Sequence, residues 1–388
     1  MPSTKLSHLS AFALLATSIS LGATACGDDE TTPVENPELR FATYNAGLAY
    51  GFVEYAEERS PLIPPAVAEL PVDVLCLQEV WNASDVAAMK SATASKLTSA
   101  FFFENSQDFA VGAACEADDV APLIACVEAN CGTVPEANCV LTECAAEFSA
   151  QTPECTTCLG ANVGGSIEAI EAACGEGSAL YAYDGAFGVG LLTNQTVTAS
   201  DQLVLSSTLN RRGVLYAELE TEAGPMHVFC THLSAALSIN YPGPAGSWEA
   251  EQRAQIDAML AYVAEKAGTE PAVILGDLNT GPALDGIAGE LPANYAVFSD
   301  AGWEAPFVSG TPACTFCGDN PLVGNPGDPK NTVLIDHVLF KNRPGGSLSS
   351  SRVLDQDVTI SVEGADTTTK LSDHYGVSVT WTGDSGND

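Results

Sequence analysis

Residues 273–280 constrain the fold more than any other stretch of this sequence. They form an apolar run, Val-Ile-Leu-Gly, that continues into Asp277, Leu278 and Asn279. A run this apolar is typical of a strand buried on both faces. Because side chains alternate along a strand, a strand that continues through Asn279 would point Asp277 and Asn279 to the same side. A carboxylate and an amide placed together can bind a hard cation and a phosphoryl oxygen, although the same residues also form an Asx turn after a strand.

The N-terminal 26 residues have the layout of an export signal. Lys5 precedes an apolar run at residues 9–21, and small residues then lead to Cys26. The run is too short to remain in a membrane as a spanning helix. Cys26 after small residues resembles the cleavage site of bacterial lipoproteins, so we expect residues 1–26 to be a lipoprotein signal peptide and Cys26 to be lipidated. Ala23 stands where such sites usually have Leu, which leaves plain secretion as the alternative.

Residues 27–38 are acidic, contain proline and lack aromatic side chains, which predicts a flexible tether. Gly27 lacks the acidic charge that commonly marks lipoproteins of the inner membrane. We therefore expect an exported monomer that its N-terminal lipid holds at the outer membrane, with a periplasmic or secreted protein as the alternative. After the export signal, no apolar stretch of the sequence is long enough to span a bilayer.

The chain is strongly acidic, with 50 acidic and 14 basic residues and a formal net charge of −36. Proteins that grip nucleic acid usually carry a basic face. This chain has few residues from which to build one, although Arg211, Arg212, Lys341 and Arg343 could cluster. Solubility is the ordinary explanation of such acidity.

Eight of the 13 cysteines lie between Cys115 and Cys174, in an acidic, Ala-rich segment without Lys, Arg or His. A missing His disfavours a zinc site, and export favours disulfides. The segment predicts short helices stapled by up to four disulfides, inserted at residues 112–180 into a larger fold. The sequence leaves their pairing open. Outside the insertion, Cys314 and Cys317 form a CxxC in a loop. Cys76 and Cys230 are either bonded to each other or are buried free thiols.

Polar residues recur within or at the ends of apolar strand patterns. They are Asn45, Glu79, His232, Asp277, Asn279, Asp336, Asp373 and His374. Strand ends and the loops beside them are where sites are built. Glu79 stands out, because a carboxylate in the apolar strand pattern at residues 72–81 is rare unless it is paired or binds a metal.

The chemistry of this set points to a metal and to proton transfer. Oxygen ligands without thiolates favour Mg²⁺, Mn²⁺ or Ca²⁺. Two His with several Asp suit acid–base work around an anionic substrate. The sequence has neither a Gly-rich phosphate loop nor a GxSxG motif. Metal-assisted attack of water on phosphorus is therefore the simplest chemistry that these residues predict.

Short motifs of this chain occur in the order seen in the endonuclease/exonuclease/phosphatase superfamily, which the chain resembles. They lie at residues 44–45, 77–79, 231–232, 276–279, 335–337 and 372–374. The resemblance covers residues 39–382 except the insertion, and a polar tail follows at 383–388. It implies an α/β fold, a four-layer sandwich of two mixed sheets packed face to face with helices outside, to which this chain adds the disulfide-rich helical insertion. It also implies hydrolysis of phosphoester bonds with Mg²⁺, for which Mn²⁺ could substitute.

The same resemblance implies which residues bind the metal and position the reactants. Glu79 would bind Mg²⁺ directly, with Asn45 beside it and Asp373 completing the metal side. Asp277 and Asn279 would position the water and the phosphoryl group.

The resemblance also implies the groups that move protons and stabilise charge. His374 would be the general base or acid, and Asp336 would hold its imidazole. His232 would stabilise charge in the transition state, and Arg212 would help to bind the substrate.

Resemblances within the superfamily divide over the substrate. Residues 212–219, 231–235 and 315–322 resemble neutral sphingomyelinases, whereas residues 372–375 resemble secreted deoxyribonucleases. An acidic surface repels DNA more than a zwitterionic choline head group. We therefore expect a phospholipid substrate such as sphingomyelin. A surface or secreted endonuclease that acts on nucleic acid is the alternative, and a catalytically inactive binding protein on the same scaffold is a second one.

A lipid hydrolase needs exposed apolar or aromatic side chains near its site to reach the bilayer interface. Tyr241, Trp303, Phe307 and Phe316 are the aromatic loop residues that we expect in this role.

Overall fold

The computed structural model describes residues 37–103, 110–111, 113–162, 164–176, 178–179, 181–237, 239, 241–323 and 331–384. The expected signal peptide with Cys26, residues 27–36 of the expected tether and residues 385–388 lie outside the described residues. Residues 36–388 form one unit, which includes the cysteine-rich segment. In the described part of the chain, no helix combines the length and apolar character needed to cross a membrane.

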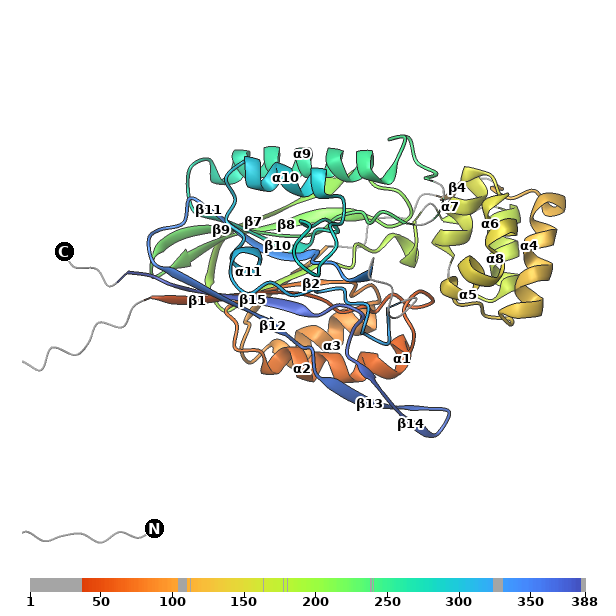
Figure 1. The fold of residues 1–388 in the computed structure, drawn as a ribbon, viewed down its shortest axis with the longest axis horizontal. Helices are drawn as coiled ribbons and strands as arrows, with labels where there is room; N and C mark the ends of the chain where they lie inside the picture. Colours follow the sequence, from red (N-terminus) through yellow and green to blue (C-terminus); the bar gives the residue numbers. More distant parts are fainter. Residues whose placement is uncertain are drawn as a thin grey trace, which may run out of the picture. The chain divides into compact units, whose positions relative to one another are not determined.

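Two mixed sheets form the centre of the fold (Figure 1). The first has the strand order β12-β15-β1-β2-β6-β3, and the second has the order β11-β10-β9-β8-β7. The strands of the first sheet are β1 (Glu38–Asn45), β2 (Val74–Gln78), β3 (Ser99–Phe102), β6 (Gly190–Thr193), β12 (Ser347–Val353) and β15 (Gly376–Thr382). Those of the second are β7 (Thr196–Leu205), β8 (Arg212–Thr221), β9 (Gly224–His232), β10 (Ala272–Asp277) and β11 (Asp336–Lys341).

Within each sheet, two neighbouring strands run in parallel. These pairs are β1 with β2 and β9 with β10, so the carboxyl ends within each pair meet at one edge. The strands β11 and β15 pair antiparallel with β10 and β1. Two-stranded ribbons are formed by β13 (Asp357–Val362) with β14 (Ala365–Lys370) and by β4 (Ala110–Val111) with β5 (Ser178–Ala179).

The apolar faces of the two sheets pack against each other. Phe41 of β1 meets Phe340 of β11 edge to face, with ring centroids 5.3 Å apart. A disulfide between Cys76 of β2 and Cys230 of β9 crosses from one sheet to the other, which settles the alternatives left open for these two cysteines. Burial of this central layer is the main stabilising contribution that a sandwich has.

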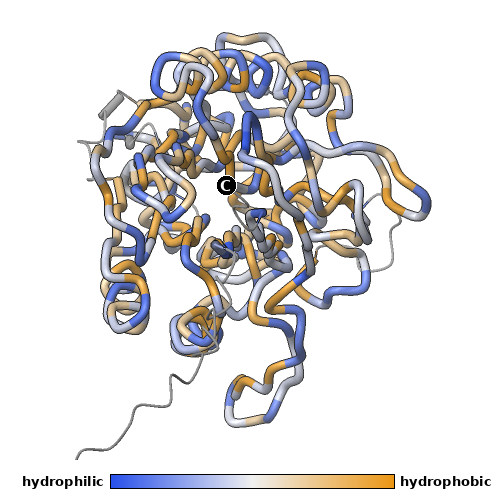
Figure 2. The backbone as a smooth tube through the Cα atoms, turned by 90° about the vertical axis from the view of Figure 1, so that its left-hand side faces the viewer, coloured by the Kyte–Doolittle hydropathy of each residue, from blue (hydrophilic) through white to orange (hydrophobic). Residues whose placement is uncertain are grey.

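Helices cover the outer faces of both sheets and complete four layers. Figure 2 looks along the strands and shows helices above and below the sheets. The helices that cover the sheets are α2 (Ile63–Glu69) and α3 (Ala83–Thr93) on the first and α9 (Trp248–Ala267) and α10 (Pro292–Asp300) on the second, with α1 (Ala56–Arg59) and α11 (Pro306–Ser309) nearby. The expected α/β sandwich of two mixed sheets is confirmed.

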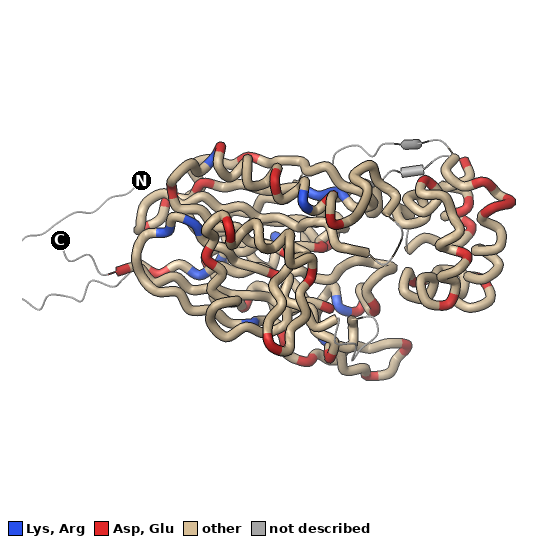
Figure 3. The backbone as a smooth tube through the Cα atoms, turned by 45° about the horizontal axis from the view of Figure 1, so that its top comes forward, with Lys and Arg blue, Asp and Glu red and all other residues tan. Residues whose placement is uncertain are grey.

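The cysteine-rich segment folds into short helices, as expected. They are α4 (Ala117–Asn130), α5 (Ala137–Glu143), α6 (Ala145–Ser149), α7 (Pro153–Ala161) and α8 (Ile167–Glu176), and we call them the helical region. All eight of its cysteines are paired, as Cys115–Cys155, Cys126–Cys144, Cys131–Cys139 and Cys158–Cys174. Figure 3 shows acidic residues and no Lys or Arg on these helices.

Candidate active site

The polar strand ends of both sheets meet at one rim, around Asp277. Asn45 ends β1, and its Nδ2 donates a 2.9 Å hydrogen bond to Asp277 Oδ2, so a side-chain bond joins the two sheets. His232 ends β9, and its Nε2 lies 3.4 Å from the same carboxylate oxygen. Burial, with the charge of Asp336, raises the pKa of Asp277 to about 7. The positive charge near Asp277 is therefore too small to offset the cost of ionising its carboxylate.

Asp277 and Asn279 come together through a turn, so of the two alternatives that the sequence left open the structure has the Asx turn and not the continuing strand. The strand β10 ends at Asp277, and Asn279 has a left-handed φ of 48°. The backbone N–H of Asn279 donates to Asp277 Oδ1 at 2.9 Å, which is the Asx turn that the sequence also allowed. The Asn279 side chain donates to the carbonyl of Leu233, just after β9, at 3.0 Å. The turn itself thus fixes both residues at the rim.

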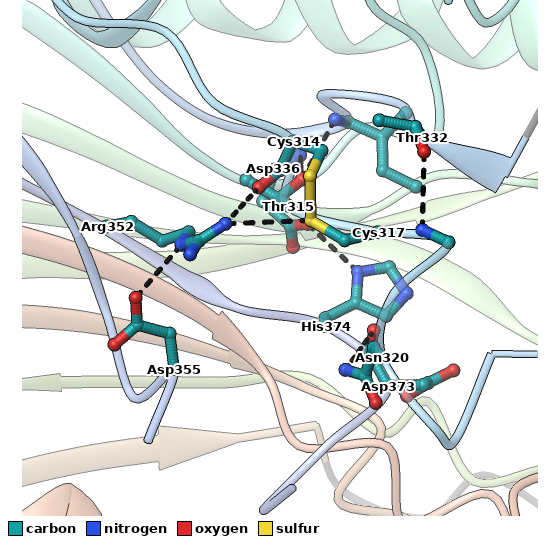
Figure 4. Close-up of a disulfide and its surroundings, with 12 residues drawn as sticks. Cys314, Thr315, Cys317, Asn320, Thr332, Asp336, Arg352, Asp355, Asp373 and His374 are labelled. Atoms are coloured by element: carbon teal, nitrogen blue, oxygen red, sulfur yellow. Dashed lines mark hydrogen bonds and ion pairs between the residues drawn. A yellow bond between two sulfur atoms is a disulfide. The ribbon is translucent and has the colours of Figure 1, made fainter. Parts of the chain in front are cut away.

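His374 and Asp336 form a hydrogen-bonded pair next to Asp277. The bond joins His374 Nδ1 and Asp336 Oδ2 over 2.9 Å, and the same nitrogen lies 3.8 Å from Asp277 Oδ2 (Figure 4). Burial alone lowers the pKa of the imidazole, but the surrounding carboxylates, Asp336 first, outweigh it and hold the pKa of His374 well above its usual value. Because Nδ1 is engaged, Nε2 is the ring atom left to exchange a proton with a substrate.

Arg212 fixes the tautomer of the second histidine. Its Nη1 lies 2.9 Å from His232 Nδ1. A guanidinium only donates, so Nδ1 must accept and the proton of His232 must sit on Nε2, toward Asp277. Burial, followed by the charges of Arg212 and His374, holds the pKa of His232 well below its usual value. His232 is therefore a neutral donor, whereas His374 favours the cationic form.

The cationic Arg212 has one N–H donor that no hydrogen bond uses among the described residues. Its Nε is buried and has no hydrogen-bond partner among the described residues. Its guanidinium lies 5.9 Å from the ring centroid of Trp81, which in turn stacks on Tyr183. Sequence reasoning missed Trp81 and Tyr183, because aromatic residues after a strand are usual in cores. A buried unpaired donor on a cation suits an anionic ligand.

Glu79 lies just beyond its strand, not inside it as the sequence pattern indicated. The strand β2 ends at Gln78, and Glu79 has a left-handed φ of 56°, a conformation that side chains other than Gly seldom adopt. Removal from water raises the pKa of Glu79, and the negative charge of Asp373 raises it further. A buried carboxylate whose ionisation is opposed in this way gains from a cation beside it.

The donor set at this rim fits a hard divalent cation. Glu79 and Asp373 offer carboxylates, and Asn45 Oδ1, which accepts the backbone N–H of Gly47 at 2.9 Å, keeps a second lone pair. Another trio, Asp277, Asp336 and His374, brings possible ligand atoms within 4.8 Å of one another. The His374–Asp336 hydrogen bond already uses Nδ1 of His374, which leaves Glu79, Asp373 and Asn45 as the alternative ligand set.

Arg59 supports this rim, and sequence reasoning missed it. The side chain is fully buried, and its guanidinium donates to the carbonyl oxygens of Gly47 at 2.7 Å, Leu371 at 2.8 Å and Glu54 at 3.0 Å. It thereby joins the loop after Asn45 to the segment before Asp373. A lone Arg in a helical pattern gives no signal of this, since its partners are backbone atoms distant in sequence.

A disulfide-closed loop holds the His374 and Asp336 segments together (Figure 4). Cys314 and Cys317 are bonded, and Thr315 Oγ1 between them accepts the backbone N–H of Asp336 at 3.2 Å. The carbonyl of Thr315 accepts the backbone N–H of Tyr375 at 2.8 Å. The loop therefore bridges Asp336 and the residue that follows His374.

A cavity of about 820 Å³ opens at this site, lined by Glu79, Arg212, His232, Asp277, Asn279, Asp373 and His374 among others. Of the aromatic residues expected around it, Phe316 lines it and contacts His374, with ring centroids 5.1 Å apart. The expectation was wrong for Trp303 and Phe307, which are only 7% and 3% exposed, because both pack into the cores beside β11. Tyr241 packs on Trp248 and is not among the lining residues.

Comparison with known proteins agrees with this architecture. The family model of the Endonuclease/Exonuclease/phosphatase family matches residues 42–374. Among curated proteins, none matches the sequence significantly. Sphingomyelinase C from Streptomyces griseocarneus is 21% identical, with a TM-score of 0.54, and the match covers 89% of this chain and 99% of that one.

Other similar solved structures share the fold at lower identity. The structure of SmcL is 15% identical, with a TM-score of 0.56, and the match covers 89% of this chain and 99% of that one. A beta toxin mutant from Staphylococcus aureus with bound magnesium ions is 11% identical, with a TM-score of 0.53, over 89% of this chain and 100% of that one. At such identities the likeness shows the fold, and the family match adds the class of reaction. This chain belongs to the endonuclease/exonuclease/phosphatase family, whose members are hydrolases that act on phosphoester bonds and typically depend on a divalent metal ion.

Proposed function

We propose that this protein is a Mg²⁺-dependent phosphodiesterase that hydrolyses a phospholipid such as sphingomyelin. The observation that carries the proposal is the gathering of hydrogen-bonding groups around Asp277. Asn45 Nδ2 lies 2.9 Å, His232 Nε2 3.4 Å and His374 Nδ1 3.8 Å from the same oxygen, Asp277 Oδ2. A buried carboxylate surrounded in this way can orient a water molecule or a phosphoryl group against the two imidazoles.

His374 exchanges the proton in this proposal. Asp336 fixes the ring through Nδ1 and stabilises its cationic form, so Nε2 gives a proton to the leaving oxygen or takes one from the attacking water. Asp336 is a positioning residue, because it acts on the substrate only through His374.

Charge that builds up on the phosphoryl oxygens meets fixed donors. His232 presents its Nε2–H beside Asp277, and Arg212 behind it supplies positive charge. The side-chain amide of Asn279 donates one N–H to the carbonyl of Leu233 at 3.0 Å and keeps a second N–H as a further donor. Such preorganised donors lower the free energy of a transition state because they need no rearrangement during the reaction.

Glu79, Asn45 and Asp373 would hold Mg²⁺, or Mn²⁺ in its place. When bound, the ion supplies a Lewis acid that withdraws charge from a phosphoryl oxygen. The carboxylates of Glu79 and Asp373 are left to hold it, because the Nδ1 atoms of the two imidazoles are engaged elsewhere, that of His232 by Arg212 and that of His374 by Asp336.

Charge and the lining of the cavity favour a lipid over DNA as the substrate. The net charge of −36 opposes a polyanion. A nuclease needs cations along its groove, and the helical region beside this cavity has no Lys or Arg. The fold shared with sphingomyelinase C supports the same choice.

We also propose that the chain is exported, with residues 1–26 as signal peptide and Cys26 as its lipidated terminus. The disulfides of the helical region and sandwich fit an oxidising compartment. Mass spectrometry of the mature protein tests this. A lipid on Cys26 is expected, and an unmodified terminus downstream of Cys26 would instead mean plain secretion.

The experiment that tests the function sets sphingomyelin vesicles against plasmid DNA, at equal enzyme and Mg²⁺. We expect release of phosphocholine and little nicking of the plasmid. Rapid nicking without phosphocholine release would replace this proposal by a nuclease. Turnover of neither substrate, nor of simple phosphodiesters, would favour a binding protein on this scaffold.

A further inference from the structure

The cavity at the site has two chemically different walls. One wall consists of the polar residues described above. The other comes from the helical region and is largely apolar, although Glu116, Asn138 and Glu171 also line it. The apolar wall includes Val120, Ile124, Val127, Val140, Leu159 and Ile170. The two walls line one continuous space of about 820 Å³, which lies within the range of about 300–1,000 Å³ typical of ligand sites.

Direct contacts hold the helical region against the loop that follows β1. The backbone N–H of Ala137, at the start of α5, donates to the carbonyl of Gly51 at 2.7 Å. Asn138 Nδ2 lies 3.4 Å from the carbonyl of Phe52. On the other side, the Cδ2 of Leu209 lies 3.0 Å from the position that a Cβ on Gly160 would take, so α7 approaches this residue closely. These contacts hold the helical region on two sides, so that its apolar wall lies beside the catalytic rim.

Some apolar side chains of the helical region stay only partly buried, because disulfides replace part of the hydrophobic core that would otherwise hold the region together. Its own core consists largely of half-cystines, among them Cys115, Cys144, Cys155 and Cys174. Ile124 and Ile170 are only partly buried and line the cavity. Apolar surface that faces water is unfavourable, and a covalently stapled region can keep such a surface open for a ligand.

We propose that this apolar wall binds the hydrocarbon chain of the lipid whose phosphodiester lies at the catalytic rim. The inference rests on the proposed function and adds a substrate subsite to it. Two features of the cavity select this occupant. In the proposed function the polar end binds the anionic phosphodiester. The other end is largely apolar, and the helical region that lines it has no Lys or Arg that would bind a second phosphate. The helical region thus selects substrates with a long hydrocarbon chain, which leaves the bilayer to enter the cavity.

The first test measures kcat/KM on soluble short-chain analogues of sphingomyelin that differ in chain length. Each methylene buried in the cavity should raise kcat/KM by up to about four-fold until the cavity is filled. A flat dependence on chain length would contradict the inference.

The second test places a charge in the apolar wall. Ile124→Glu should lower the ratio of kcat/KM for long-chain sphingomyelin to kcat/KM for p-nitrophenyl phosphocholine by about ten-fold or more, because a carboxylate opposes burial of several methylenes. Ala125→Glu is the matched control, since Ala125 is exposed and does not line the cavity, and its ratio should equal that of the wild type. The milder Val140→Thr keeps the side-chain shape and should lower the ratio by a few-fold.

The outcomes separate this inference from the proposed function. Wild-type cleavage of both substrates, with equal ratios in Ile124→Glu, Val140→Thr and Ala125→Glu, would overturn the subsite alone. A wild-type protein that releases phosphocholine from neither substrate would overturn the proposed function and the subsite with it. If Ile124→Glu does not fold, the ratio measured on Val140→Thr decides.

Discussion

The sandwich and the helical region reach a folded state by different means. The sandwich buries a layer between its sheets, and the disulfide Cys76–Cys230 ties together residues 154 apart in sequence. The helical region has a small core and disulfides that close loops of 8 to 40 residues. A large apolar core can hold buried charged groups in fixed positions. A region that is cross-linked by disulfides can keep its shape without dense packing.

The charges of the two regions differ in the same way. Every described Lys and Arg lies outside the helical region, and the charged groups of the candidate site all come from the sandwich. We therefore assign the chemistry to the sandwich and the choice of substrate to the helical region. If this division holds, changes at the rim of the sandwich should alter turnover on every substrate, whereas changes in the helical region should alter the choice among substrates.

His374→Ala should lower turnover by roughly 10²–10⁴-fold, on lipid and soluble phosphodiester alike, because a positioned acid or base contributes about this much. Circular dichroism should show an intact fold. Steady-state turnover near the wild-type value would show that the sandwich does not use His374 for proton transfer.

Removal of disulfides should distinguish the two regions by stability. Replacing Cys76 and Cys230 by Ser removes a cross-link over 154 residues, for which loop entropy gives a loss of about 5 kcal/mol. The same change at Cys131 and Cys139, 8 residues apart, should cost about 2.5 kcal/mol. Denaturant unfolding measures both losses, and an equal loss would contradict the comparison.

Asp336→Asn should lower turnover less than His374→Ala does, because Asn keeps a hydrogen bond to the imidazole and loses only the charge that favours its cationic form. Both kcat and the fold should be measured. A loss larger than that of His374→Ala would mean that Asp336 contacts the substrate or the metal directly.

Replacing Cys314 and Cys317 by Ser should have the smallest effect on stability, under about 2 kcal/mol, because the cross-link spans only 3 residues. Its effect should fall on kcat, since the loop bridges Asp336 and Tyr375. A change in KM for lipid with kcat unchanged would instead assign this loop to substrate binding.

The strands and helices could be predicted from local patterns, because buried strands and amphipathic helices carry their signals in neighbouring residues. Their arrangement in four layers was implied by the resemblance of the ordered motifs to the superfamily. Asp277 and His374 could be found as polar residues at strand ends. Their surroundings could not, because these depend on residues far apart in sequence. Arg59 bonds to backbone carbonyls, and Trp303 is an aromatic loop residue that turns into a core.

The pairing of the cysteines could not be predicted for the same reason. The sequence indicated staples in the helical region, but which of its eight cysteines pair depends on how the helices pack. The turn at Asn279 is the reverse case, since local residue chemistry allowed it as an alternative to the strand.

The most direct test of the account is the release of phosphocholine from sphingomyelin vesicles by the purified protein in Mg²⁺, in excess chelator, and after Mg²⁺ is restored. Burial first, and the negative charge of Asp373 second, raise the pKa of Glu79, so its ionised form gains from a nearby cation. We expect release in Mg²⁺, none in chelator, and recovery on restoring Mg²⁺, with Glu79→Gln needing more Mg²⁺ than the wild type. Full release in excess chelator would contradict the account.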